Sequence, residues 1–206
     1  MTPFTTPITL GGRHATLEPL SLSHHDGLAV ATRDGELWKL WYTSVPSPED
    51  MRAEIERRLG LREAGSMLPW TVRSRPGGKI VGMTTYMNID AKFRRVEIGS
   101  TWYARSAQRT PLNTECKLLL LAHAFETLDC IAVEFRTSFF NFASRRAIER
   151  LGARQDGILR CHQWHADGSL RDTVVFSIVR AEWPAVKMHL EFKLGAAGSA
   201  GPAEVP

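Results

Sequence analysis

The sequence has few cysteines and no long apolar run. Cys116, Cys130 and Cys161 show neither pairing parity nor CxxC spacing, which argues against a disulfide framework or a cysteine zinc site. The longest apolar run, LLLLAHAF at 118–125, is far shorter than the ~20 residues of a membrane span. The N-terminus MTPFTTPITL lacks the basic-then-apolar layout of a signal peptide. We therefore expect a cytosolic protein with reduced thiols and no membrane partner.

The sequence also lacks a basic tract, although its net charge is +4. Its arginines are dispersed, in pairs such as Arg57-Arg58, Arg94-Arg95 and Arg145-Arg146. There is neither a helix-turn-helix signal nor the paired aromatics of an RNA-recognition strand, so no specific nucleic-acid partner is expected. Histidines such as His24 and His25 are interpreted as surface polar residues, and no metal is expected. The charge suits an anionic small ligand at least as well as a nucleic acid.

What remains is an ordinary globular composition, 43% hydrophobic and 23% charged over 206 residues. This length is enough for one domain with a proper core, and the chain shows no internal repeat. We expect a single domain over 1–194. The segment GAAGSAGPAEVP at 195–206 is rich in small residues and has nothing to bury, so a flexible tail is expected there.

The spacing of apolar and turn residues predicts a mixed α/β (α+β) fold. A strand, a helix and a strand follow one another from 95 to 139, which predicts a right-handed parallel crossover. The other strands are expected to pair as antiparallel hairpins. The expected strands are a pair within 8–20, then 68–74, 79–89, 95–103, 131–139 and a hairpin turning at 166–168; the expected helices follow Ser21 or Ser23 and cover 47–64, 113–128, 141–152 and 181–194.

The turn before the helix at 113–128 is rich in groups that bind anions. Gln108-Arg109-Thr110-Pro111-Leu112-Asn113 supplies backbone amides and polar side chains at the positive end of the helix dipole. The alternative is an ordinary capped helix, with Thr110 as the cap and Pro111 at the first helical position. The turn by itself leaves both interpretations open.

The chain resembles the GNAT superfamily of N-acetyltransferases in the order of its elements and in two stretches, EIGSTWYARSAQRTPLNTECKLLLLAHAFETL and VEFRTSFFNFASRRAIERLGARQDGILR. These stretches look like the branch of RimJ/RimL-type ribosomal-protein N-terminal acetyltransferases. The resemblance covers element order over 8–180 and motif detail over 95–180. It implies a mostly antiparallel mixed sheet with flanking helices, a central pair of parallel strands that splay apart, and acetyl-CoA as co-substrate.

In this family the loop before the central helix reads Gln/Arg-x-x-Gly-x-Gly/Ala and wraps the coenzyme pyrophosphate. Gln108 matches, but Pro111 and Asn113 replace the two glycines, and Pro111 removes one amide donor. The remaining amides of 108–114 are then expected to hold the anion with the helix dipole. The resemblance implies coenzyme contacts at Gln108, Arg109, Thr110, Leu112, Asn113, Thr114 and Asn141, and main-chain contacts at Thr101, Trp102 and Tyr103 on the splayed strand.

Glu97 is the candidate general base. Strand alternation predicts that Val96 and Ile98 point to one face, while Glu97, Gly99 and Thr101 point to the other. A carboxylate beside a glycine has room to take a proton from a substrate ammonium, directly or through a water. The alternative is a cross-strand ion pair with an arginine. The resemblance favours the base, because GNAT members often carry an acid on this strand.

Ser144 is the candidate acid near the leaving sulfur. The resemblance places a hydroxyl on the helix after the second parallel strand close to the thioether, and a residue such as Asn141 on the coenzyme. A thiolate with an ordinary pKa of about 8.5 departs more easily if a hydroxyl donates to it. Either residue could instead cap the helix, and Tyr103 is an alternative acid.

The expected function is an acetyl-CoA-dependent N-acetyltransferase acting on a primary amine, by direct attack in a ternary complex. A protein N-terminus, including that of a ribosomal protein, and a small-molecule amine remain open as acceptors, and a homodimer is open too. The alternative is a catalytically inactive acyl-CoA-binding or regulatory module of the same fold. The family geometry implies that the acceptor lies near Trp38-Lys39-Leu40-Trp41-Tyr42, Phe93-Arg94, Arg160, His162, Trp164 and His165.

Overall fold

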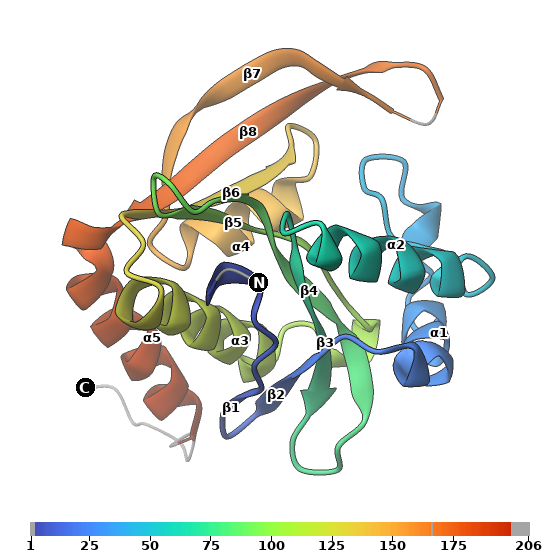
Figure 1. The fold of residues 1–206 in the computed structure, drawn as a ribbon, viewed down its shortest axis with the longest axis horizontal. Coiled ribbons are helices and arrows are strands. Elements are labelled where there is room, and N and C mark those ends of the chain that lie inside the picture. The colour runs from blue at the N-terminus through green and yellow to red at the C-terminus, as the bar shows by residue number, and fades with distance from the viewer. Residues whose placement is uncertain (1–2, 166, 199–206) are drawn as a thin grey trace, which may run out of the picture.

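The strands form one twisted sheet. The structure, a computed structural model, describes residues 3–165 and 167–198, with side chains to residue 195. Within these residues eight strands run in the order β1-β2-β3-β4-β5-β6-β8-β7 (Figure 1). All neighbours are antiparallel except β5 and β6. The strands are β1 (Leu10–Gly11), β2 (Ala15–Pro19), β3 (Leu68–Ser74), β4 (Ile80–Asp90), β5 (Arg95–Tyr103), β6 (Ala132–Ser138), β7 (Arg154–Trp164) and β8 (Leu170–Val179).

Helices cover both faces of the sheet. The α-helices are α1 (His25–Arg33), α2 (Met51–Glu63), α3 (Pro111–Ala122), α4 (Phe142–Glu149) and α5 (Trp183–Gly198). On one face α2 reaches the sheet through Arg58, whose guanidinium bonds Thr85 of β4. On the other face α3 packs under β4, where the Tyr86 hydroxyl donates to the Leu120 carbonyl. Figure 1 shows α5 lying along the outer side of α3. None of the described helices is long and apolar enough to cross a membrane.

The core lies mainly between the sheet and α3. Trp70 and Tyr86 meet edge to face, with ring centroids 4.9 Å apart, a preferred arrangement for buried aromatic rings. Leu120 and Leu121 of α3 are fully buried. Each fully buried leucine contributes about 2 kcal/mol of transfer free energy. The largest fully buried side chains also include Phe135, Phe176, Leu17, Leu28, Met51, Ile55, Leu68 and Met83.

The predicted parallel crossover is present, and the two parallel strands separate early. Arg95, Val96 and Glu97 of β5 pair with Ala132, Val133 and Glu134 of β6. Beyond these pairs β5 continues to Tyr103 and β6 to Ser138, and these described segments do not pair with each other. The splay expected for the GNAT fold therefore begins directly after Glu97.

A bulge in β5 corrects the predicted face of Thr101. Thr85 pairs with Gly99 while Met83 pairs with Trp102, so β5 holds an extra residue here, and Ser100 adopts a left-handed φ of 47°. The bulge shifts the alternation by one residue. The Thr101 hydroxyl consequently lies 2.9 Å from Lys117 Nζ of α3, on the face opposite to Glu97. The prediction that Thr101 shares a face with Glu97 was wrong.

Several element bounds differ from the expected ones. The helix expected over 47–64 begins at Met51, because the Ser47 hydroxyl accepts from the Asp50 amide in the turn before it. The helix expected over 113–128 begins at Pro111, and its end is a π-helical turn, His123–Thr127. The tail expected from 195 was wrong at its start, because α5 continues through 198. Residues 199–206 and Ala166 of the predicted turn lie outside the described residues.

A buried carboxylate ties α3 to the turn between β1 and β2. Glu115 accepts from the amides of Arg13 at 2.8 Å, His14 at 2.6 Å and Ala15 at 2.7 Å. Its side chain fills the space that a Cβ on Gly12 would occupy, since such an atom would lie 2.3 Å from the Glu115 carboxyl carbon. Glu115 thus holds the first turn of α3 against the sheet edge.

Lys117 is a buried amine whose charge costs stability. Burial lowers its pKa from 10.5 to about 8, and the nearby Cys116 thiol opposes this only in part. Below about pH 8 the folded state carries the charge in the core, so stability should rise as the pH increases from about 8 to 10.5. We expect Lys117→Met to raise the free energy of unfolding by about 2 kcal/mol at pH 7, with the gain shrinking toward pH 10.5.

Urea unfolding across this pH range tests the effect of Lys117→Met. The Thr84 and Thr101 hydroxyls bond each other at 2.8 Å, so the substitution leaves neither hydroxyl without a hydrogen-bond partner. Lys187→Met, at an exposed ion pair with Glu126, is the matched control and should change stability by less than about 1 kcal/mol. A loss of stability in Lys117→Met at pH 7 would contradict the account.

Candidate active site

Two buried polar atoms lie on the segments of β5 and β6 that have separated from each other. Trp102 Nε1 and Ser138 Oγ are buried and have no hydrogen-bond partner among the described residues. Trp102 follows Thr101 and so points to the opposite face from it, the face of Glu97; Ser138 shares that face through the pairing of Glu134 with Glu97. Buried polar groups are normally satisfied, and both of these atoms are free to bond a ligand that lies between the separated strands.

The start of α3 is a capped helix that keeps free amides. Thr110 is the N-cap, its hydroxyl accepting from Leu112 N at 3.3 Å and donating to Ala107 O at 2.8 Å, and Pro111 occupies the first helical position. The capped-helix interpretation is therefore correct for the local structure. It does not exclude an anion, because the amides of Thr110 and Asn113 have no partner within the helix.

The other loop residues differ in their exposure. The Gln108 side-chain amide donates to the Tyr103 carbonyl at 2.9 Å and so joins the loop to the end of β5. Arg109 has a left-handed φ of 59° and an exposed side chain. Leu112 and Thr114 are buried, while Asn113 is partly exposed. The residues that reach solvent at this turn are therefore Gln108, Arg109, Thr110 and, in part, Asn113.

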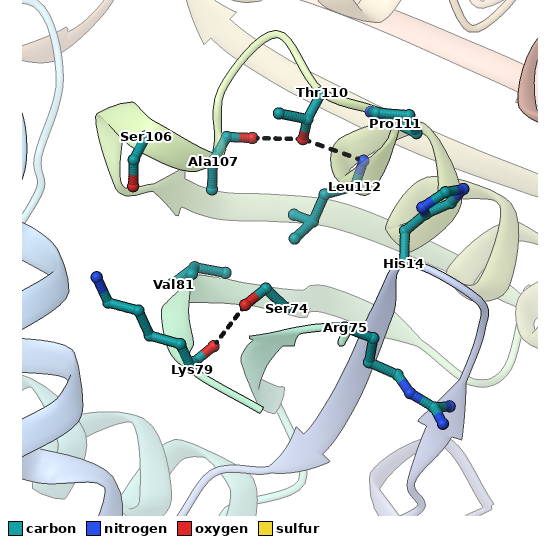
Figure 2. A pocket seen from close by; sticks show the side chains of 10 residues that line it. All are labelled: His14, Ser74, Arg75, Lys79, Val81, Ser106, Ala107, Thr110, Pro111 and Leu112. Atoms are coloured by element: carbon teal, nitrogen blue, oxygen red, sulfur yellow. Dashed lines mark hydrogen bonds between the residues drawn. The ribbon is translucent and has the colours of Figure 1, made fainter. Parts of the chain in front are cut away.

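A basic pocket lies on the β3–β4 side of the same turn. Figure 2 shows Thr110, Pro111 and Leu112 above, with His14, Ser74, Arg75 and Lys79 below. The pocket encloses about 270 Å³. His14, Arg75 and Lys79 bring positive or ionisable groups to the start of α3. These three residues could not be predicted from the sequence, because they come from the start of β2 and the β3–β4 turn, far along the chain from the loop that they join.

Glu97 is buried beside a glycine, as its sequence context suggests. Its side chain is 6% exposed, accepts from Asn88 Nδ2 at 2.7 Å and lies 3.7 Å from Arg136 Nε. Burial raises the pKa of its carboxyl above the usual value of 4.5, against the lowering by Asn88 and Arg136. A Cβ on Gly99 would lie 2.7 Å from Oε1, so only glycine leaves the carboxylate this position. Glu97 has both a cation partner and the raised pKa useful in a base.

Asn141 and Ser144 lie at the start of α4. The Asn141 side chain is the N-cap and accepts from Ser144 N at 3.0 Å. Its capping role, left open by the sequence, is thus observed. The Ser144 hydroxyl is partly exposed and makes no hydrogen bond within the described residues. Tyr103, the alternative acid, lies on the α3 face of the sheet; burial raises its pKa well above 10, with a smaller contribution from Cys116.

Aromatic residues from three segments meet near the ends of β6 and the β7–β8 hairpin. The Trp41 ring centroid lies 5.5 Å from that of Phe140 and 5.1 Å from that of His165. Phe93-Arg94 was expected to line the same site. It directly precedes the first residue of β5, Arg95, and there Arg94 forms an ion pair with Asp129. This expectation was wrong. The parallel β5 and β6 both run from the Arg94 end to the Phe140 end, so the two loops lie at opposite ends of the strands.

Two other residues of the β7–β8 hairpin that were expected at the acceptor site contact side chains of β8. Arg160 pairs with Asp172 at 2.6 Å, and His162 Nδ1 lies 3.1 Å from the Thr173 hydroxyl. Trp164 is 72% exposed. The described residues contain no group of His, Cys, Asp and Glu arranged to hold a metal ion.

A sheet that is antiparallel except for one parallel, splayed strand pair is the arrangement of the GNAT acyltransferases. Residues 14–154 match the family described as acetyltransferase (GNAT) domain. The chain belongs to this family of N-acetyltransferases, whose members use acyl-CoA. Comparison with curated proteins found no match.

Solved structures share the fold over nearly the whole chain. A protein from T. thermophilus described as an acetyltransferase has 36% identity and a TM-score of 0.80, covering 91% of this chain and 97% of its own. A GCN5-related N-acetyltransferase from Brucella melitensis has 29% identity and a TM-score of 0.83, covering 93% and 87%. RimJ from Mycobacterium smegmatis, in complex with CoA-disulfide, has 20% identity and a TM-score of 0.78, covering 93% and 96%. The last likeness supports the fold alone.

Proposed function

We propose that this protein is an acetyl-CoA-dependent N-acetyltransferase that transfers acetyl to a primary amine by direct attack in a ternary complex, within one domain that includes α5 (Trp183–Gly198). The observation that carries the proposal is the buried Glu97 carboxylate at the point where β5 and β6 part. Members of this family use acyl-CoA as the acyl donor. Trp102 Nε1 and Ser138 Oγ, buried and without a partner among the described residues, suit an extended ligand that carries amide groups and lies between the separated ends of β5 and β6.

The proposed mechanism assigns each proton. Glu97 takes a proton from the acceptor ammonium, directly or through a water, and Arg136 and Asn88 hold its carboxylate in place. The freed amine attacks the thioester carbonyl and forms the C–N bond. As the C–S bond breaks, the nitrogen gives its excess proton to the Ser144 hydroxyl, which passes a proton to the departing sulfur, so that free thiol leaves; this relay is the role we assign to Ser144. The amides of Thr110 and Asn113, with Arg109, would hold the pyrophosphate.

The acceptor is an amine that enters the active site beside the aromatic cluster of Trp41, Phe140 and His165. Two structures with the same fold are described as RimL, a ribosomal L7/L12 alpha-N-protein acetyltransferase, and as an acetyltransferase that modifies the N-terminal serine of L7/L12, each at 16% identity. They make a peptide N-terminus one acceptor to test, beside small amines. A peptide or small amine with an apolar part suits the aromatic entrance.

Release of free thiol from acetyl-CoA tests the proposal. Peptides with free N-termini, including one beginning with serine, and a panel of aliphatic and aromatic amines serve as acceptors, with N-acetylated peptides as blanks. We expect thiol release that requires a free amine and gives product heavier by one acetyl group. Tight binding of acetyl-CoA with no product from any acceptor would instead favour a catalytically inactive acyl-CoA-binding module.

A further inference from the structure

Arg58 of α2 is a fully buried cation that no step of the proposed mechanism uses. It is 1% exposed, and its Nε donates to Glu54 Oε1 at 2.6 Å. Burying a guanidinium is costly, and replacing a buried ion pair by apolar residues is often neutral or stabilising. An arginine at this position is therefore poorly explained by stability alone.

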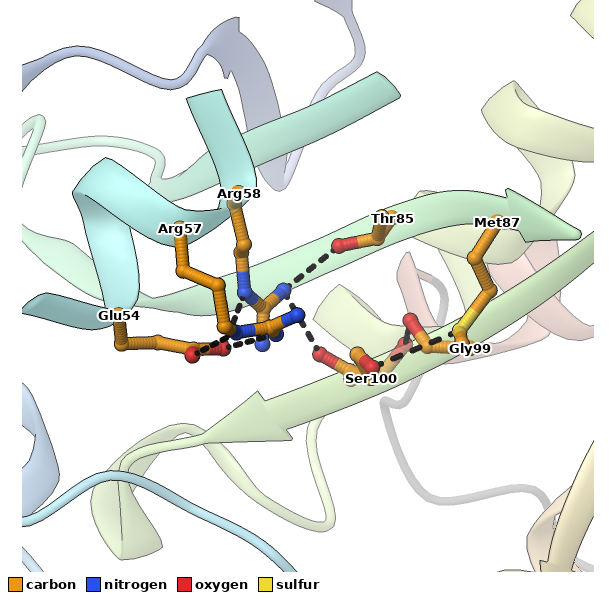
Figure 3. Close-up of polar contacts among 8 residues, drawn as sticks. Glu54, Arg57, Arg58, Thr85, Met87, Gly99 and Ser100 are labelled. Atoms are coloured by element: carbon orange, nitrogen blue, oxygen red, sulfur yellow. Dashed lines mark hydrogen bonds and ion pairs between the residues drawn. The ribbon is translucent and has the colours of Figure 1, made fainter. Parts of the chain in front are cut away.

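The guanidinium of Arg58 bridges two strands at the bulge. Its Nη1 donates to the Thr85 hydroxyl of β4 at 2.6 Å and lies 3.3 Å from the Ser100 carbonyl of β5. Figure 3 shows Arg58 reaching down from α2 between these strands, with Glu54 and Arg57 beside it. Gly99, paired with Thr85, and Ser100, which has the left-handed φ, are thus both close to one fixed cation.

The bulge decides which side chains the end of β5 places on the face of Glu97. Without the extra residue the alternation would continue, and Thr101 would face the Glu97 side in place of Trp102. With it, Trp102 takes that face and its indole Nε1 is left buried and, among the described residues, unpartnered. A left-handed residue other than glycine persists only where its surroundings hold it. Arg58 is the side chain from outside the sheet that bonds the Ser100 carbonyl.

We propose that Arg58 is a positioning residue that fixes the Ser100 bulge and thereby the shape of the acyl-CoA site proposed between β5 and β6. The inference rests on the proposed function, because it assigns the space between these strands to acyl-CoA. Lysine could keep the charge pair with Glu54, but a single ammonium cannot reproduce the planar fork that reaches Glu54, Thr85 and Ser100 together.

Arg57 provides a matched control. It neighbours Arg58 on α2 and donates to the same Glu54 at 2.7 and 2.9 Å, but its side chain is 52% exposed and its hydrogen bonds stay within the helix. Arg57→Lys therefore tests the loss of a guanidinium beside Glu54 without touching the bulge.

The test measures the dissociation constant of CoA by calorimetry for wild type, Arg58→Lys, Thr85→Val and Arg57→Lys, with circular dichroism to confirm folding. We expect Arg58→Lys to weaken CoA binding about tenfold, Thr85→Val about threefold and Arg57→Lys less than twofold. In turnover, KM for acyl-CoA should rise while KM for the acceptor stays within twofold.

The outcomes separate this inference from the proposed function. A folded Arg58→Lys that binds CoA like wild type, or an Arg57→Lys that weakens binding equally, would overturn the positioning role. Failure of both Arg58→Lys and Thr85→Val to fold would show a purely structural role and would also overturn it. Failure of the wild-type protein to bind CoA would instead overturn the proposed function.

Discussion

Glu97→Gln is expected to lower kcat/KM about a hundredfold at neutral pH while leaving the fold intact. The substitution removes the group that takes the ammonium proton, and general base catalysis contributes typically 10²–10⁴-fold. The amide keeps an oxygen for the hydrogen bond from Asn88, so the side chain should stay in place. Initial rates with saturating acetyl-CoA and varied acceptor measure the loss.

The pH dependence sharpens this prediction. Because burial raises the pKa of Glu97 above 4.5, the wild-type rate should fall as the pH drops through an inflection above that value. The Gln variant should lack this inflection. Glu56→Gln is the control, since Glu56 is an exposed carboxylate of α2 that pairs with Arg52 at 3.4 Å and is assigned no proton transfer. A Glu97→Gln rate within threefold of wild type would rule out the base.

Glu115→Ala is expected to destabilise the protein by about 3 kcal/mol, because three buried or partly buried amides lose their acceptor at once. For a domain of this size the melting temperature should drop by roughly 6–12 °C. The amides of Arg13, His14 and Ala15 should also exchange hydrogen faster, because the turn loses its anchor on α3. Calorimetry and hydrogen exchange measure the two effects.

Glu56→Ala is the control for Glu115→Ala. Glu56 is an exposed carboxylate, 54% accessible, that pairs with Arg52 along α2 at 3.4 Å. Its removal should cost less than about 0.5 kcal/mol. Equal destabilisation by the two substitutions would mean that the Glu115 anchor contributes nothing beyond helix propensity.

The periodic parts of the sequence predicted most of the fold. The strand at 95–103 and the parallel crossover to 131–139 follow from alternation and element order, and both are present. The bulge at Ser100 was not predicted, because an extra residue in one strand leaves no mark in the alternation of polar and apolar residues. It is this bulge that moved Thr101 to the α3 face.

Contacts between segments far apart in the chain could not be predicted from the sequence. Glu97 and Gly99 lie two residues apart on one strand, so their closeness could be predicted. The bond from Arg58 to Ser100 and the anchoring of residues 13–15 by Glu115 join segments about 40 and 100 residues apart. The pair Arg57-Arg58 looks like two equivalent surface arginines in the sequence, and burial alone distinguishes them.

Thermal unfolding with and without acetyl-CoA tests the central claim most directly, that the splayed strands and the α3 turn hold an acyl-CoA. At about 100 times its dissociation constant the ligand should add about 2.7 kcal/mol, a rise of roughly 5–10 °C. ATP and NAD, which carry phosphates but no pantetheine, should have a much smaller effect. No shift at millimolar acetyl-CoA would mean that Pro111 and Asn113, in place of the family's glycines, have abolished the site, and would contradict the account.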